Sequence, residues 1–240
     1  MDGHRFPGPH DAAVAPLTMK GILIVVEGAT AVGRSTHIAL LKAWLERTGH
    51  AAIETGSTGS ALAGKGLKKA KEGHTLSGLT MSLFYATDFA DRLEREVMPA
   101  LRAGFVVLTD RYTYSLMARA IIRGADPVWM SHIYDFAPRP DLVIYLRTSV
   151  KEMVTRVVHT SGLTYWDSGM DLCLGEDLFD SFVEYQGRLV AALDVMAEEH
   201  RFAVVDTSAN LEEVAERLKV LLTPLLPQAC RPPLQRYTRH

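Results

Sequence analysis

Short apolar runs alternate with longer amphipathic segments along this chain. Strands covered on both faces are predicted by four near-continuous runs rich in Val and Ile, at 21–27, 105–110, 141–147 and 202–207, and a weaker run at 51–55 predicts a fifth strand. Apolar residues at helical spacing predict helices at 37–47, 79–102, 114–122, 150–158, 177–199 and 211–222. Because alternating strands and helices are typical of a parallel sheet with helices on both faces, we expect an α/β fold whose ligand sites lie at the carboxyl ends of the strands.

Composition and charge limit the classes of protein to which this chain can belong. The chain has 240 residues, of which 48% are hydrophobic and 22% are charged, which is ordinary for one soluble globular domain. A formal charge of -2 disfavours nucleic acid as a main partner but does not exclude a local anion-binding site. Without a long apolar run or a signal peptide, we expect a cytoplasmic protein with no membrane contact. The domain is predicted at 19–223, between flexible tails at 1–18 and 224–240.

The stretch "EGATAVGRST" at 27–36 follows the first predicted strand and opens a helix. Its order of Gly, four residues, Gly, basic residue and hydroxyl residues is that of a loop whose backbone N–H groups surround phosphates. The predicted donor-binding residues are Gly28, Ala31, Val32, Gly33, Arg34, Ser35 and Thr36, with Ser35 also placed to reach a Mg²⁺ ion. Arg34 stands where lysine is usual, so the positive charge is kept but its geometry becomes a planar fork. Whether turnover persists, slows or is lost with this arginine stays open.

A second charged loop follows the strand at 105–110, in the stretch "LTDRYTYS" at 108–115. Asp110 is placed to hold a metal ion, directly or through water, and Arg111 to face the transferred group or an acceptor phosphate. The alternative is a capping aspartate beside a surface arginine. The phosphate-loop pattern upstream makes the catalytic interpretation the better one.

Three blocks of the sequence resemble thymidylate kinases: "VEGATAVGRST", "LFYATDFADRLEREVMPALRAGFVVLTDRYTYSLMA" and "PDLVIYLRTSVKEMVTRV". The resemblance covers most of 21–222. It implies a three-layer P-loop NTPase fold with a central parallel five-stranded sheet, and ATP and Mg²⁺ as cofactors. It also implies transfer of the γ-phosphoryl group to dTMP or a related small-molecule nucleotide, and a possible homodimer. The catalytic residues would be Arg34, Asp110 and Arg111.

The acceptor side departs from the pattern of that family. Thr30 stands where the family usually has an aspartate, Asp88 aligns with an arginine, and Arg119 aligns with a tyrosine. The predicted acceptor-binding residues are Thr30, Asp88, Arg92, Arg111, Ser115 and Arg119. Arg92 could instead pair with Asp88 at the helical i, i+4 spacing, and Arg119 could face solvent. A kinase for another acceptor and a non-catalytic nucleotide-binding module therefore stay open.

A long glycine-bearing connection at 159–177 is the predicted lid. It contains no arginine, and Arg156 just before it is the nearest candidate for contact with phosphates. Tyr165 and Trp166 either stack on a ligand or pack the lid down. The lysines near the second strand, at 65, 68, 69 and 71, either attract an anionic acceptor or form a solvated face of a loop or short helix.

Overall fold

Five parallel strands form the centre of the computed structural model, which describes residues 19–56, 59–73 and 76–227. The strands are β1 (Ile22–Gly28), β2 (Ala52–Gly56), β3 (Val106–Asp110), β4 (Leu142–Arg147) and β5 (Ala203–Asp206), in the order β2-β3-β1-β4-β5. The predicted parallel five-stranded sheet is thus confirmed. β1 lies in the middle of the sheet, between β3 and β4. The phosphate loop begins at the carboxyl end of β1 and the second charged loop at the carboxyl end of β3, so the two loops start side by side.

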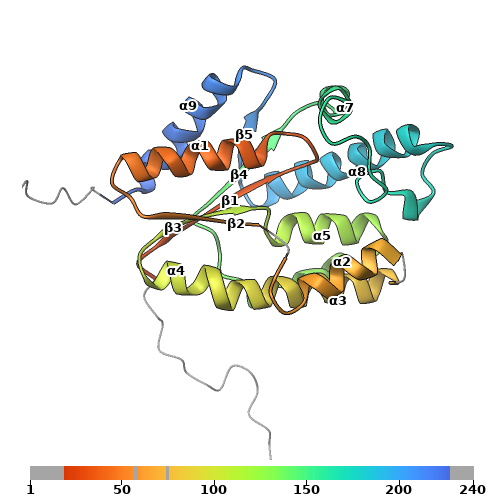
Figure 1. Ribbon diagram of the computed structural model, residues 1–240, viewed down its shortest axis with the longest axis horizontal. Coiled ribbons are helices and arrows are strands. Elements are labelled where there is room, and N and C mark those ends of the chain that lie inside the picture. Colours follow the sequence, from red (N-terminus) through yellow and green to blue (C-terminus); the bar gives the residue numbers. More distant parts are fainter. Residues whose placement is uncertain (1–18, 57–58, 74–75, 228–240) are drawn as a thin grey trace, which may run out of the picture.

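Helices cover both faces of this sheet, which gives three layers (Figure 1). The α-helices are α1 (Arg34–Arg47), α2 (Gly64–Gly73), α3 (Gly78–Arg92), α4 (Met98–Arg102), α5 (Thr113–Ile122), α6 (Pro127–Ile133), α7 (Val150–Val158), α8 (Leu178–Glu199) and α9 (Leu211–Leu222). Ile24 and Val26 of β1 join α1 and α9 in one apolar cluster, whereas Leu23 and Val25 join α3, α4 and α5 in another. Burial on both faces explains why β1 is a continuous apolar run.

The predicted helix at 79–102 is interrupted by a π turn, η1 (Leu93–Val97), between α3 and α4. The turn places polar groups against β2. Arg92 is 4% exposed and donates from Nη2 to Thr55 Oγ1 at 2.7 Å, while Thr55 Oγ1 donates to Glu96 Oε2 at 2.8 Å. Local periodicity could not reveal this turn, because it depends on a contact with a distant strand.

Two short helices differ from the sequence-based expectation. The sequence pattern did not decide whether the segment at 64–73 forms a loop or a short helix. It forms helix α2, whose single buried side chain is Leu67. Helix α6 was not predicted, although Asp126 caps it by accepting from Trp129 N at 2.7 Å and Pro127 occupies its first turn.

The segment 224–227 of the predicted C-terminal tail includes the end of a 3₁₀ turn, η3 (Thr223–Leu225). The N-terminal tail at 1–18 and the remainder of the C-terminal tail lie outside the described residues. Within the described part of the chain, no helix has the length and apolar character needed to cross a membrane.

Candidate functional site

The phosphate loop runs from the carboxyl end of β1 to the start of α1 and follows the predicted course. Gly28 has to be a glycine, because a Cβ there would lie 2.7 Å from the carbonyl oxygen of Leu146. Gly33 has a φ of 89° and precedes the first helical residue, Arg34. The six residues at 31–36 line a cavity of about 170 Å³ at the amino end of α1. This position suits an anion, because the first N–H groups of a helix lack partners within the helix.

Arg34 folds across the phosphate loop. Its Nη1 donates to the carbonyl oxygen of Gly28 at 2.8 Å and also to that of Ala29, while its Nε donates to Asp110 Oδ1 at 2.6 Å. The planar guanidinium therefore connects the loop to the end of β3 through three groups. An ammonium has no such fork, so a lysine could not reproduce this set of contacts in the same geometry.

Asp110 ends β3 and faces the phosphate loop. Burial alone would raise the pKa of its carboxyl group, but the charge of Arg34 and hydrogen bonds from Arg34 and Ser35 lower that pKa below the ordinary value. Ser35 Oγ donates to Asp110 Oδ2 at 3.1 Å. An ionised carboxylate and a hydroxyl at this distance are oxygen ligands of the kind that Mg²⁺ prefers. The described residues contain no cluster of three His, Cys, Asp or Glu side chains for a metal, so any Mg²⁺ here would rely on few protein ligands.

Glu27, at the end of β1, organises the loop that contains Arg111. Its carboxylate is fully buried and accepts from Tyr112 N at 2.8 Å, from Ser115 N at 3.3 Å and from Ser115 Oγ. Burial raises its pKa despite these hydrogen bonds. Arg111 itself has a φ of 69°, a strained conformation for a residue with a Cβ. Sequence analysis assigned Glu27 no role, although a carboxylate within an apolar strand was a visible signal.

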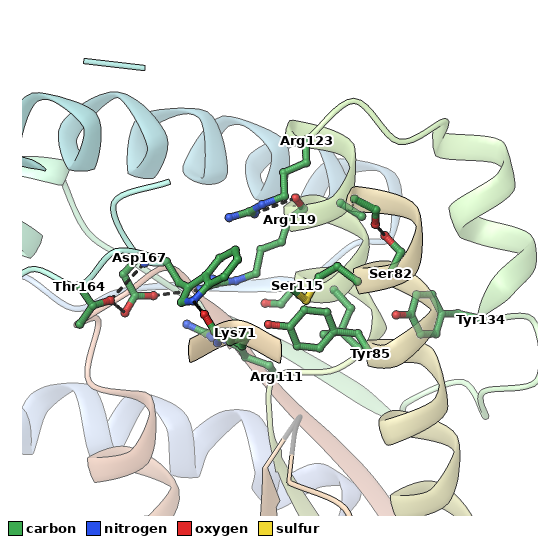
Figure 2. A pocket seen from close by; sticks show the side chains of 15 residues that line it. Lys71, Ser82, Tyr85, Arg111, Ser115, Arg119, Arg123, Tyr134, Thr164 and Asp167 are labelled. Atoms are coloured by element: carbon green, nitrogen blue, oxygen red, sulfur yellow. Dashed lines mark hydrogen bonds and ion pairs between the residues drawn. The ribbon is translucent and has the colours of Figure 1, made fainter. Parts of the chain in front are cut away.

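A second cavity, of about 300 Å³, lies beside the Arg111 loop (Figure 2). Figure 2 shows Tyr85 and Tyr134 at one end of this cavity and Thr164 and Asp167 at the other, with Arg119 between them. Arg111 and Ser115 also line it. We call this space the acceptor cavity, since it combines an aromatic end with a charged end.

Two of the three arginines that line the acceptor cavity, Arg111 and Arg119, have unused donors. Burial and the charges of Arg34 and Arg119 hold the pKa of Arg111 well below its ordinary value. Burial would also lower the pKa of Arg119, but Tyr185 and Asp167 raise it. Among the described residues, Arg111 Nε and both Nε and Nη2 of Arg119 are buried without a hydrogen-bond partner. Arg119 Nη2 lies 3.6 Å from Asp167 Oδ1, close enough for electrostatic attraction only.

Arg123, one turn further along α5, differs from Arg119 because its donors are used. Its Nε and Nη2 bind the carboxylate of Asp171 at 2.7 and 3.1 Å, and its Nη1 donates to Tyr185 Oη at 2.7 Å. Its guanidinium also lies 6.0 Å from the ring centre of Trp166. Arg123 therefore attaches the segment at 159–177 to α5 and α8.

Three of the predicted acceptor-binding residues do not line the acceptor cavity. Asp88 is fully buried, and its carboxylate accepts from the backbone N–H groups of Gly59 at 2.9 Å and Ser60 at 2.8 Å. Arg92 is bound to Thr55 beside β2, so it neither faces the cavity nor forms a hydrogen bond with Asp88. Thr30 lies within the phosphate loop, and its hydroxyl donates to Asp167 instead. Sequence alignment could not foresee that loop amides occupy the Asp88 carboxylate.

The segment at 159–177 covers the acceptor cavity with Thr164, Trp166 and Asp167. Trp166 Nε1 donates to the carbonyl oxygen of Lys71 at 3.1 Å, and the Lys71 ammonium lies 5.7 Å from the Trp166 ring centre. Trp166 thus holds the segment against α2 as well as lining the cavity. Sequence analysis gave no role to Asp167, whose only signal was its place in the predicted lid.

Arg156 lies apart from the acceptor cavity, on α7 beside the phosphate loop. Its Nη2 donates to the carbonyl oxygen of Thr207 at 2.7 Å, and its Nη1 lies 3.5 Å from the carbonyl oxygen of Ala31. These contacts join α7 to the segment after β5. Its predicted contact with phosphates stays a prediction.

Comparison with known proteins matches this chain to one family over most of its length. The profile of the family described as thymidylate kinase matches residues 26–218. A "Probable thymidylate kinase 2" of Saccharolobus solfataricus is 35% identical over 207 residues, which is 85% of this chain and 96% of the relative. A "Probable thymidylate kinase" of Pyrococcus horikoshii is 34% identical over 64% of this chain and 78% of its own length. A "Thymidylate kinase" of Clavibacter michiganensis is 31% identical over 84% of this chain and 94% of its own length.

Proposed function

The chain belongs to the thymidylate kinase family, and from that membership we propose that it transfers the γ-phosphoryl group of ATP to dTMP, giving dTDP and ADP. In this reaction an oxygen of the acceptor phosphate forms a bond to the γ-phosphorus. The bond between that phosphorus and the β–γ bridging oxygen breaks, and ADP leaves. The residues of the chain contribute positioning and charge rather than covalent chemistry.

The donor phosphates bind in the cavity of the phosphate loop. Backbone N–H groups of residues 31–36 surround them, and Arg34 and Thr36 lie at the same wall. Because Arg34 already spans the loop and Asp110, it fixes the distance between the donor phosphates and the end of β3. These contacts support a positioning role for Arg34, and the catalytic role that the resemblance implies requires its guanidinium also to contact the donor phosphates at this wall of the cavity.

Ser35 and Asp110 are the proposed ligands of Mg²⁺, directly or through water. When bound, the ion neutralises charge on the phosphate oxygens of the donor. Asp110 suits this role because its lowered pKa keeps it ionised throughout the physiological pH range.

The acceptor phosphate binds to Arg111 and Arg119, which line the acceptor cavity together with Ser115. The planar base then extends toward Tyr85 and Tyr134, whose rings offer apolar and stacking surfaces. The observation that carries this assignment is that two arginines lining this cavity keep buried nitrogens without a hydrogen-bond partner among the described residues, namely Arg111 Nε and Arg119 Nε and Nη2. A dianionic phosphate supplies the acceptors that these donors need.

Turnover with a panel of nucleotides tests the proposal. We expect ADP release from ATP and Mg²⁺ with dTMP, and a rate at least about 100-fold lower in Asp110→Asn, which keeps the shape of the side chain but removes its charge. Equal activity with several other nucleoside monophosphates would contradict the assignment of dTMP. The same preparation in a sizing experiment tests the homodimer, which we also propose from family resemblance.

A further inference from the structure

Gln186 of α8 connects the phosphate loop to the segment that covers the acceptor cavity. Its side chain is fully buried and uses both ends of its amide. Gln186 Oε1 accepts from Thr30 N at 3.2 Å, and Gln186 Nε2 donates to the carbonyl oxygen of Asp167 at 2.6 Å and to Thr30 Oγ1 at 3.3 Å. The amide has only one orientation that satisfies all three contacts, so it fixes Thr30 and Asp167 relative to each other.

The Thr30 hydroxyl completes this connection. It accepts from Gln186 Nε2 and donates its single proton to Asp167 Oδ1 at 3.2 Å. The same carboxylate oxygen lies 3.6 Å from Arg119 Nη2 in the acceptor cavity. A continuous chain of polar contacts therefore runs from a backbone N–H of the phosphate loop to an arginine that faces the acceptor.

We propose that the contacts among Gln186, Thr30 and Asp167 couple acceptor binding to ATP binding, with Gln186 and Thr30 acting as positioning residues. The proposal rests on the proposed function, since it needs an acceptor in the acceptor cavity. An acceptor there touches Thr164, Trp166 and Asp167. It thereby stabilises the covering segment in the position in which the carbonyl oxygen of Asp167 accepts from Gln186. Gln186 then holds Thr30 N, which fixes the phosphate loop in the conformation seen here. The acceptor must therefore tighten ATP binding, and by linkage ATP must tighten acceptor binding equally.

The coupling is measured as a ratio of dissociation constants. Titration calorimetry with a non-hydrolysable ATP analogue and Mg²⁺ gives the constant without dTMP and with saturating dTMP. For the wild-type chain we expect dTMP to tighten binding of the analogue about tenfold, within the usual range of such couplings. Gln186→Met removes both amide contacts and should bring the ratio close to one, whereas Thr30→Ser keeps the backbone contact and the hydroxyl and should keep the coupling.

Ser181→Ala is the matched control. Ser181 also ties the covering segment to α8, because its Oγ donates to the carbonyl oxygen of Ser168 at 2.7 Å, but within the described part of the chain it forms no side-chain hydrogen bond with the phosphate loop. Its ratio should match that of the wild-type chain. Thr30→Ala, which removes the hydroxyl contact with Asp167 but leaves the Gln186 amide in place, should lower the ratio without bringing it to one, and it is the second test should Gln186→Met lose its folded state, as judged by circular dichroism.

Three results would overturn the inference: a wild-type ratio of one, an unchanged ratio in Gln186→Met, or an equal loss in Ser181→Ala. Turnover of dTMP by the same wild-type preparation separates this failure from that of the proposed function. A chain that phosphorylates dTMP but shows no coupling refutes the inference alone. A chain that turns over no nucleoside monophosphate refutes the proposed function together with the inference that rests on it.

Discussion

The phosphate loop and the acceptor cavity contain arginines in opposite states. In the phosphate loop, Arg34 binds two carbonyl oxygens and the Asp110 carboxylate. In the acceptor cavity, Arg111 and Arg119 keep buried nitrogens that no described residue satisfies. A buried unsatisfied donor costs about 1–3 kcal/mol, so the acceptor cavity carries a cost that the phosphate loop avoids. The proposed donor site is therefore organised by the protein itself, whereas we propose that an anion completes the acceptor cavity.

Arg119→Met tests this difference where we expect its largest effect. The change keeps much of the side-chain volume but removes the charge and the unused donors. We expect the KM for dTMP to rise on the order of 100-fold, because losing one side of a buried charge pair costs about 2–5 kcal/mol. Steady-state kinetics at saturating ATP measures this, and the KM for ATP should change far less.

Arg188→Met is the control for that substitution. Arg188 lies on α8 and pairs with Glu184 at 2.8 Å, but both side chains are about half exposed. An exposed pair contributes little, so this variant should keep the wild-type KM for dTMP. If Arg119→Met also left that KM unchanged, the acceptor phosphate would have to bind elsewhere.

Arg34→Lys tests the phosphate loop and should have a smaller effect. Lysine keeps the charge but cannot hold Asp110 and the two loop carbonyl oxygens together. We expect kcat/KM for ATP to fall about tenfold, which corresponds to the loss of one or two hydrogen bonds. The KM for dTMP should stay close to the wild-type value. A higher kcat/KM for ATP in Arg34→Lys would show instead that arginine at this position lowers the rate of phosphoryl transfer.

Glu27→Gln should have the smallest effect, and one that depends on pH. The pKa of Glu27 is raised in the folded chain, so its contribution to stability is full below the unfolded value of 4.5 and is lost as the pH rises through the folded pKa. Glutamine does not titrate. The melting temperature of the wild-type chain minus that of the variant should therefore fall, by roughly a few degrees, between acidic and neutral pH. Thermal melts across this range measure it, and a difference that grows with pH would contradict a raised pKa.

The regular part of the fold follows from local pattern. All five strands were predicted with ends within one residue of those observed, because short apolar runs mark them. Burial on both faces explains the continuous runs of the central strands β1 and β3, but the same expectation was wrong for β5, an edge strand whose Val204 is 54% exposed. The phosphate loop was predicted for a similar reason, since its glycines and Arg34 are adjacent in sequence. Local order is enough where one segment supplies the whole feature.

The acceptor cavity could not be predicted in the same way, because distant segments build it. The charged loop after β3 and the helix that follows it gave Arg111, Ser115 and Arg119, which do line the cavity. The other walls of the cavity come from α3, with Tyr85, and from the segment at 159–177, with Asp167. No local pattern records such contacts. Asp88 shows the converse error: its alignment suggested a substrate contact, but two backbone amides nearby in space take its carboxylate.

The π turn at Leu93–Val97 limits how the segment from α3 to α4 can change in length. A π turn accommodates one more residue than an α-helical turn, so it resembles an insertion that the rod of α3 and α4 has absorbed without unwinding. Tyr85 at the acceptor cavity and Leu101 against the sheet lie on opposite sides of this insertion. Deleting one residue would turn one end of the rod relative to the other by about 100°. The length of this segment is therefore as constrained as its composition. A variant that lost the extra residue would need different side chains on the wall of the acceptor cavity that contains Tyr85.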